Sequence, residues 1–355
     1  MRRFHLQTRP APRVCGAAHR CTAQKWGMSS RRTLAVRADG MLESVSRGAT
    51  APRPTMDVRK LRILYNRRSG PGHSRLDAVL QAVARAWGDV ADRAWYFPAD
   101  AAESDRMVDA ALADGAECIL VCGGDGTVSS VGRRLAGTGV AMGVVPLGSG
   151  NGLARHFGQS LDPAESVEQL AAGAPCDIDV GVAGGVPFLV SASVAWDAAL
   201  VEAYDAIPFR GVASYALAGA WAWFDYKPQP VEATLDGGET IRLEKPFLFS
   251  VGNLAGWGGG ALIDADASAE DGRLELIAAE RRDAPAMLAA LPRVFQKGGK
   301  ALPGVTHRSF RSMAVARPAA APVQLDGELV DLPASFDVAV RPAALRILVP
   351  GKTKP

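Results

Sequence analysis

The stretch Glu117–Gly158, ECILVCGGDGTVSSVGRRLAGTGVAMGVVPLGSGNGLARHFG, decides the fold. Short apolar runs at 119–122 and 140–145 are typical of parallel strands buried on both faces. A turn of small residues follows each run, GGDGT at 123–127 and GSGNG at 148–152. In an open α/β sheet, ligands bind at this carboxyl edge of the strands. The stretch therefore predicts an α/β domain with a ligand site on two glycine turns.

The residues of the first turn favour a phosphate ligand accompanied by a divalent cation. Glycine lets backbone N–H groups approach a phosphate, and the N-terminus of the following helix adds a favourable dipole. Asp125 would repel that phosphate unless a divalent cation lay between them. Thr127 supplies a hydroxyl that can cap the helix or touch a phosphate. The stretch is neither a P-loop, since no Gly-Lys-Ser/Thr follows, nor the G-x-G-x-x-G dinucleotide motif, since Ser129 replaces its third glycine.

The pair of motifs, GGDGT at 123–127 and PLGSGN at 146–151, resembles the diacylglycerol kinase catalytic domain. Bacterial lipid kinases, diacylglycerol kinases and sphingosine kinases share this domain, and the likeness extends over roughly residues 60–350. It implies an α/β N-terminal nucleotide-binding domain of the NAD-kinase and diacylglycerol-kinase type, followed by a C-terminal antiparallel β-sandwich domain. The pattern beyond Asp177 supports the sandwich independently, because short alternating apolar runs with frequent glycines are typical of that fold.

Three segments are expected: a disordered basic arm at 1–56, an ATP-binding domain at 57–178 and a β-rich lipid kinase domain at 179–350. The arm holds ten Arg, one Lys and two acidic residues, a net charge of +9, which leaves −6 for the rest of a chain whose total is +3. A mildly acidic body argues against nucleic acid as a partner. The arm is either a transit-like or membrane-attracted segment or sequence upstream of a true start at Met41 or Met56, and we favour the second interpretation.

The resemblance assigns ATP binding to residues in four motifs. They are Asn66, Ser69, Gly70, Gly123, Gly124, Asp125, Gly126, Thr127, Ser149, Asn151 and Glu328. It assigns catalysis to Asp125 and to Asp326, the latter as general base within LDGE at 325–328. A lipid hydroxyl must lose its proton as it attacks the γ-phosphorus, and a carboxylate can accept that proton. ATP and Mg²⁺ are therefore the expected cofactors.

The segment DADASAEDGRLE at 264–275 resembles the magnesium loop of bacterial lipid kinases. The resemblance implies a carboxylate ligand from Asp271 and backbone carbonyl ligands from Ser268 and Arg273. Oxygen ligands suit Mg²⁺. Asp179 resembles the acidic residue that joins Asp125 through water and Mg²⁺ in the family. The alternative for the loop is an acidic β-turn without a metal.

Four positions depart from the family pattern. Pro98 replaces a threonine that contacts ATP, Ser129 and Ser130 replace an Asn-Glu pair, and Gly152 replaces an aspartate. These losses keep open a non-catalytic lipid- or nucleotide-binding regulator. A sphingoid-base or ceramide-type kinase is a further alternative, but Ala203 stands where its substrate aspartate is expected. The favoured reading is an ATP-dependent lipid kinase that converts diacylglycerol to phosphatidic acid.

The remaining signals concern location. The five cysteines form no disulfide framework, and Cys118 and Cys122 lie about 13 Å apart on a strand, so a reduced, cytoplasmic setting is expected. The apolar run 212–224 is shorter than the ~20 residues that span a bilayer. Trp221, Trp223, Phe224 and Tyr226 either meet lipid or belong to the core, and the core is favoured. The expected partner is a lipid substrate at a membrane surface, with a homodimer left open.

Overall fold

The computed structural model describes residues 58–69, 74–88, 94–205, 207, 212–258, 261–281, 286 and 289–350. The expectations for the basic arm at 1–56 and for Gly70 lie outside these residues. Among the described helices, none is long and apolar enough to cross a membrane.

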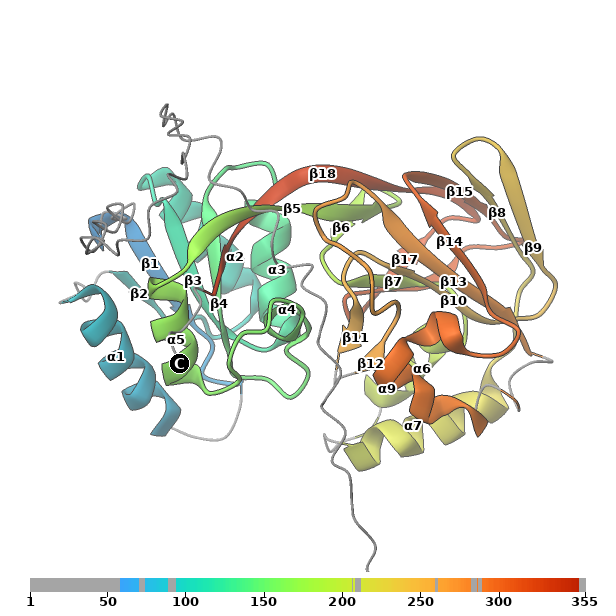
Figure 1. The fold of residues 1–355 in the computed structure, drawn as a ribbon, viewed down its shortest axis with the longest axis horizontal. Helices are drawn as coiled ribbons and strands as arrows, with labels where there is room; N and C mark the ends of the chain where they lie inside the picture. The colour runs from blue at the N-terminus through green and yellow to red at the C-terminus, as the bar shows by residue number, and fades with distance from the viewer. Residues whose placement is uncertain are drawn as a thin grey trace, which may run out of the picture. The chain divides into compact units, whose positions relative to one another are not determined.

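The N-terminal half is a parallel sheet between two helical layers (Figure 1). Its strand order is β2-β1-β3-β4. The strands are β1 (Leu61–Tyr65), β2 (Trp95–Tyr96), β3 (Cys118–Gly123) and β4 (Ala141–Pro146). The helices are α1 (Ser74–Trp87), α2 (Ala101–Ala113), α3 (Asp125–Leu135), α4 (Gly152–His156) and α5 (Pro163–Ala171).

Each face of this sheet has its own apolar core. Buried side chains of α2 and α3, such as Val108 and Val131, pack with Ile119 and Val121 of β3. Those of α1 and α5 pack with the alternate residues of the strands on the other face. Every residue of β3 and β4 is therefore buried, as the continuous apolar runs predict.

The C-terminal half is an antiparallel β-sandwich, so the predicted fold class is confirmed. One sheet has the order β14-β13-β10-β7-β16-β17, and the other continues from β4 through β18, β15, β8 and β9. Residues from both sheets form one buried cluster between them. The strands are β5 (Ala174–Ala183), β6 (Val186–Phe188), β7 (Ser191–Ser193), β8 (Val231–Leu235), β9 (Glu239–Leu243), β10 (Pro246–Gly252), β11 (Gly256–Gly258), β12 (Ala261–Leu262), β13 (Leu274–Glu280), β14 (Thr306–Phe310), β15 (Ser312–Ala316), β16 (Ala321–Leu325), β17 (Glu328–Leu332) and β18 (Ser335–Val349).

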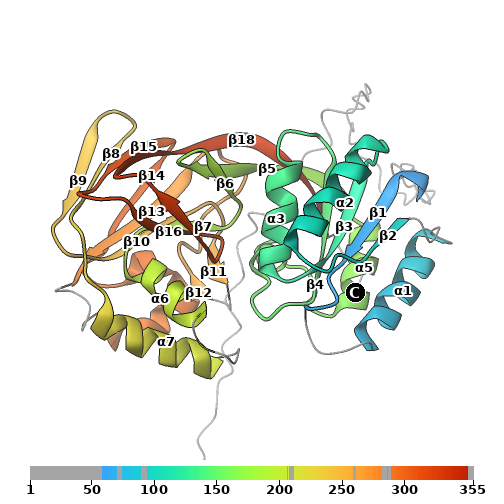
Figure 2. The same cartoon turned by 180° about the vertical axis from the view of Figure 1, so that it is seen from behind.

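Two long strands join the halves. β5 and β18 pair from Ala183 with Val338 to Ala174 with Val349, and β18 also runs parallel to β4 (Figures 1 and 2). One sheet is thus continuous across the two halves, and the expected domain boundary at 178/179 lies inside β5.

Helices cover the outer face of the six-stranded sheet. α6 (Trp196–Asp205) and α7 (Val212–Asp225) lie there, together with the short α9 (Val294–Lys297). Their inward side chains join a cluster with Phe247 and Ile277 of the sheet. α7 contains the apolar run at 212–224 noted from the sequence.

The cysteines behave differently from one another. Cys118 and Cys122 are buried and free, in agreement with their spacing on β3. Cys176 on β5 is also buried but takes part in a disulfide bond, which the expected absence of a disulfide framework did not anticipate.

Candidate functional site

The two glycine turns lie side by side because β3 and β4 are adjacent and parallel, with Gly123 opposite Pro146. Asp125, at the start of α3, joins them. Its carboxylate accepts hydrogen bonds from the backbone N–H of Asn151 (2.8 Å) and of Gly152 (2.7 Å). Asn151 has a left-handed backbone (φ 53°), a conformation that Asn tolerates better than most residues. The sequence motifs therefore meet at one point through a single carboxylate.

Glycine is required where the turns touch. A Cβ on Gly148 would lie 2.7 Å from the Cα of Gly124, too close for any other residue without movement of the backbone. A Cβ on Gly126, by contrast, would meet nothing within 4 Å. The close approach of the turns explains Gly148, whereas Gly126 keeps the backbone at the start of α3 uncovered.

The turn after β1 reaches the same place. The side-chain amide of Asn66 donates to the Thr127 hydroxyl (2.8 Å), and its carbonyl oxygen accepts from the N–H of Arg68 (2.9 Å). The hydroxyl of Ser69 accepts from the N–H of Gly124 (3.3 Å). Asn66 and Ser69 thus contact the GGDGT turn, and their part in nucleotide binding stays a prediction.

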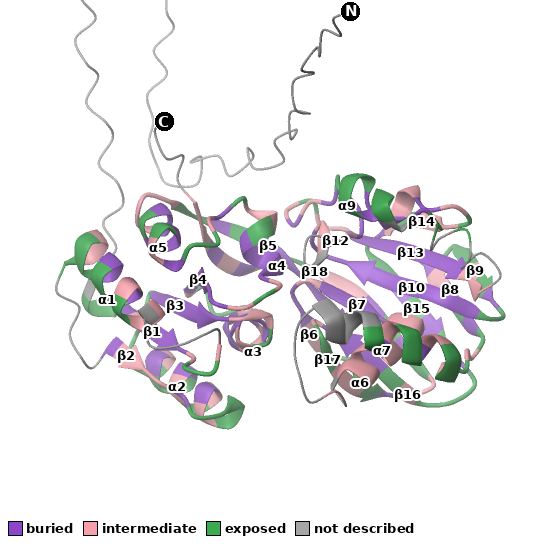
Figure 3. Ribbon diagram, turned by 90° about the horizontal axis from the view of Figure 1, so that it is seen from below, coloured by how far each residue is buried: buried purple, intermediate pink, exposed green. Residues whose placement is uncertain are grey.

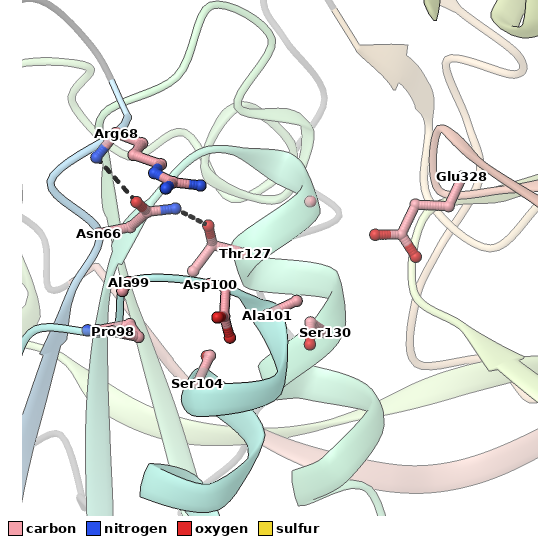
Figure 4. Close-up of a pocket in the computed structure, with 11 residues that line it drawn as sticks. Asn66, Arg68, Pro98, Ala99, Asp100, Ala101, Ser104, Thr127, Ser130 and Glu328 are labelled. Atoms are coloured by element: carbon pink, nitrogen blue, oxygen red, sulfur yellow. Dashed lines mark hydrogen bonds between the residues drawn. The ribbon is translucent and has the colours of Figure 1, made fainter.

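A cavity of about 230 Å³ opens beside these residues (Figure 4). Its lining comprises Asn66, Arg68, Pro98, Ala99, Asp100, Ala101, Ser104, Gly126, Thr127, Ser130 and Glu328. The expected nucleotide residues Asn66, Gly126, Thr127 and Glu328 meet there, and Glu328 faces the cavity from β17 in the other half (Figure 4). Ser149 is exposed at the tip of the second turn and does not line the cavity.

Ser104 in this cavity is a residue that sequence reasoning missed. It is buried, and its hydroxyl has no hydrogen-bond partner among the described residues. Ser104 follows Asp100, whose side chain caps α2, so from sequence it is indistinguishable from any serine in a first helical turn. The cavity also includes Pro98, where the family threonine is absent.

Asp326 lies against the nucleotide half. It occupies the left-handed turn between β16 and β17 (φ 54°), and its side chain is only 1% exposed. One carboxylate oxygen accepts from the N–H of Val190 (2.7 Å) and Ser191 (3.1 Å). The other accepts from the N–H of Leu189 (2.8 Å) and from the hydroxyl of Ser129 in α3 (2.5 Å). The carboxylate is therefore oriented by three backbone donors and one hydroxyl.

Arg133, one turn further along α3, holds the same hairpin. Its guanidinium donates to the carbonyl of Leu325 (2.9 Å) and pairs with Glu328 (2.8 Å), and it lies 3.7 Å from Asp326. Ser129 and Arg133 were not predicted as site residues. The available signal was their i, i+4 spacing on the helix that begins in GGDGT, which places both side chains on one face.

The expected magnesium loop is organised around Asp179. Its buried carboxylate accepts from the N–H of Gly272 (2.6 Å) and of Ala343 (2.8 Å). Asp271 is exposed and caps its own turn by accepting from the N–H of Arg273, while the Ser268 hydroxyl accepts from the N–H of Glu270. The carboxylate of Asp179 thus connects Gly272 of this loop to Ala343 of β18. The carboxylate of Asp125 instead contacts the second glycine turn.

The donor chemistry of this loop fits a hard divalent cation. Burial is the main cause that raises the pKa of Asp179, and the charge of Asp271 adds to it. Burial and then the charge of Asp179 raise the pKa of Glu270. Like charges held this close are relieved by a bound cation, and oxygen ligands suit Mg²⁺.

A second group of metal-ligating side chains lies on neighbouring strands. Ligand atoms of Asp264, Glu275 and His307 all lie within 4.8 Å of one another. His307 contacts both carboxylates, at 3.0 Å and 2.8 Å, and the Lys300 ammonium also pairs with Asp264. The Lys300 ammonium pairs with Asp264, and the imidazole of His307 contacts both carboxylates, so these side chains already serve as partners for one another.

Comparison with known proteins identifies the families that the two halves match. The model for the diacylglycerol kinase catalytic domain matches residues 60–183, and the model for the YegS C-terminal NAD kinase beta sandwich-like domain matches residues 190–349. A protein of Pseudomonas putida named "Probable lipid kinase YegS-like" is 30% identical over 211 residues, which cover 56% of this chain and 69% of the relative. A diacylglycerol kinase of Mycobacterium tuberculosis is 29% identical over 301 residues, covering 83% and 96%.

Solved structures show the same fold. A crystal structure of a diacylglycerol kinase from Bacillus anthracis superposes with a TM-score of 0.65 at 19% identity, covering 82% of this chain and 97% of that chain. The chain therefore belongs to the diacylglycerol kinase catalytic domain family. It is an ATP-dependent phosphotransferase of the lipid kinase class.

Proposed function

We propose that this chain transfers the γ-phosphoryl group of ATP to the hydroxyl of diacylglycerol and thereby forms phosphatidic acid. The single observation that carries the proposal is the contact of Asp326 with α3, the helix that starts in the GGDGT turn. It holds a carboxylate of the sandwich against the nucleotide half. The name of the Mycobacterium tuberculosis relative, whose length the chain covers to 96%, supports diacylglycerol as the acceptor.

The glycine turns and the adjoining cavity would bind ATP. The backbone at Gly126, which no neighbouring atom crowds, and the N-terminus of α3 suit the phosphates. Asn66 and Thr127 already share a hydrogen bond at the cavity wall, and Ser104 brings an unpaired hydroxyl to it. Asp125 would hold Mg²⁺, which neutralises charge on the transferring phosphoryl group when bound. Asp179, Ser268, Asp271 and Arg273 would hold a second, structural Mg²⁺.

Asp326 would act as the general base. In the arrangement described, the Ser129 hydroxyl donates to one of its carboxylate oxygens, and a lipid hydroxyl can take the same position. The proton of the lipid O–H passes to Asp326 as the lipid oxygen bonds to the γ-phosphorus. The bond from that phosphorus to the β–γ bridging oxygen breaks, and ADP leaves. The N–H groups of residues 189–191 keep the carboxylate in place throughout.

The test is phosphoryl transfer from γ-labelled ATP with Mg²⁺ to diacylglycerol, monoacylglycerol, ceramide and sphingosine in mixed micelles. We expect labelled phosphatidic acid from wild type and its loss in Asp326→Asn. Label in ceramide or sphingosine alone would show that the acceptor is a sphingoid lipid and not diacylglycerol. A folded, ATP-binding protein that labels none of the four lipids would favour the regulator instead.

A further inference from the structure

One helix of the sandwich exposes an apolar face. Leu217, Ala220, Trp221 and Phe224 lie at i, i+3, i+4 and i+7 of α7, and all four are exposed. The exposed fractions are 49% for Leu217, 68% for Trp221 and 86% for Phe224. A helix that is apolar all round is normally buried, so this face lacks a partner within the described part of the chain. Figure 3 shows the exposed side of α7.

The structure divides the four aromatic residues of this region. Trp223 packs against Phe247 with ring centroids 5.3 Å apart, and the Tyr226 hydroxyl donates to the carbonyl of Pro246. These two belong to the core, as favoured from sequence. Trp221 and Phe224 point away from it and require a different explanation.

A second exposed aromatic residue lies on the same layer. Phe295 of α9 is 56% exposed, while its neighbour Val294 is buried in the cluster that includes Trp223. Arg293 and Lys297, two positions before and after Phe295, are exposed, and the segment 291–297 contains no acidic residue, whereas on α7 the exposed Asp225 follows Phe224. Aromatic and basic side chains in this combination suit the surface of an anionic membrane.

We propose that Leu217, Trp221, Phe224 and Phe295, named the docking face here, insert into the surface of a bilayer that contains anionic lipids. α7 has 14 residues, about 21 Å in length, and would lie in the plane of the interface with its apolar side down. Trp and Phe are the side chains that favour the interface and the acyl boundary. The basic residues Lys227, Arg293 and Lys297 would meet lipid head groups.

The proposal identifies the partner of the proposed function, on which it rests, because a lipid acceptor is presented by a membrane. Since no described helix crosses a bilayer, the lipid would be met at the surface. The docking face belongs to the helical layer on the six-stranded sheet, and that sheet also carries Asp326 at the end of β16. The proposed membrane contact and the proposed general base are thus both attached to the six-stranded sheet.

The experiment compares the full-length chain with the double variant Trp221→Ser and Phe224→Ser. Vesicles of equal parts phosphatidylcholine and phosphatidylglycerol are sedimented at about 1 M salt, where the Debye length is about 3 Å and attraction of the basic arm is screened. We expect binding to fall by about tenfold for each aromatic side chain removed. The matched control is Leu80→Ser with Leu161→Ser, two exposed apolar residues of the other half, which should bind as wild type.

Two further measurements distinguish a failure of this proposal from a failure of the proposed function. With a short-chain, monomerically dissolved diacylglycerol, the double variant should keep wild-type turnover, whereas with diacylglycerol in vesicles it should lose at least tenfold. Equal vesicle binding by wild type and double variant would overturn the docking face and leave the kinase assignment untouched. Sedimentation velocity without lipid is the last reading. If wild type is a dimer and the double variant a monomer, a second copy covers this face and the membrane proposal fails.

Discussion

Asp125 and Asp326 have similar structural roles in two regions that are assembled from different parts of the chain. Both carboxylates accept backbone N–H groups and thereby fix a turn. The donors to Asp125 are 26 and 27 residues away in the same half. The donors to Asp326 are 135 to 137 residues earlier, and its hydroxyl partner Ser129 is 197 residues away. One cluster is therefore assembled by neighbouring strand turns, and the other only when the two halves come together.

This difference separates binding from catalysis. The Asp125 cluster can form whenever the parallel sheet folds, because β3 and β4 bring its parts together. The Asp326 cluster depends on β7, β16 and α3 at once. We therefore expect packing changes in the first cluster to act on stability, and loss of the Asp326 carboxylate in the second cluster to act on turnover.

The largest effect is expected for Asp326→Asn. An amide cannot accept the lipid proton, so kcat should fall by about 100- to 10,000-fold with the folded structure kept. Glu328→Gln is the matched control, since Glu328 pairs with Arg133 at the half-exposed rim of the same hairpin. Because Glu328 lines the proposed nucleotide cavity, the KM for ATP of this variant should rise, while its kcat should stay within about tenfold of wild type. If Glu328→Gln is the inactive variant and Asp326→Asn is not, the general base is Glu328.

A pH effect is expected at another contact between the halves. His156 of α4 accepts a hydrogen bond from the N–H of Ala255, and burial lowers its pKa from 6.5 to about 4. As the pH falls, His156 therefore binds a proton near pH 6.5 in the unfolded chain but only near pH 4 in the folded chain. The stabilisation is complete above pH 6.5 and is lost as the pH falls to about 4, by up to about 3 kcal/mol.

The measurement is the free energy of unfolding in denaturant between pH 4 and 7 for wild type and His156→Asn. Asparagine keeps an acceptor near the position of Nδ1 but does not titrate. The difference in free energy of unfolding between wild type and His156→Asn should become smaller towards low pH. A constant difference across this range would show that His156 carries no such coupling.

A change in the local cluster tests whether close packing of the turns matters. In Gly148→Ala the new Cβ would lie 2.7 Å from Gly124, and overpacking should lower the free energy of unfolding by about 1–3 kcal/mol. Gly126→Ala is the matched control, because its Cβ meets nothing within 4 Å. It should be neutral or stabilise by up to about 1 kcal/mol, as alanine favours a helix. Equal unfolding midpoints for both variants would contradict the packing argument.

A smaller effect is expected for Ser129→Ala. Three backbone donors remain on Asp326, so the loss should be about 1 kcal/mol of stability, with turnover largely kept. In Ser130→Ala the lost bond is to the more exposed Asp105 within the same half, and the cost should be smaller still. A strong loss of turnover in Ser129→Ala would mean that this hydroxyl takes part in proton transfer.

Several parts of the fold could be read from the sequence because their causes are local. Apolar runs followed by glycine turns indicated β3 and β4. α5 was not predicted, although Asp162 caps it and Pro163 is its first residue, and both are signals for the start of a helix.

The sequence by itself determined the α/β-plus-sandwich fold, the glycine turns and the family resemblance, since periodicity and turn chemistry act over a few residues. Only the tertiary structure decided which distant side chains meet. It brought Ser129 and Arg133 to Asp326, opened the cavity to Ser104, and left Trp221 exposed while burying Trp223. The physical reason is that these outcomes depend on how a helix packs on a sheet built from segments more than a hundred residues apart, which no local pattern encodes.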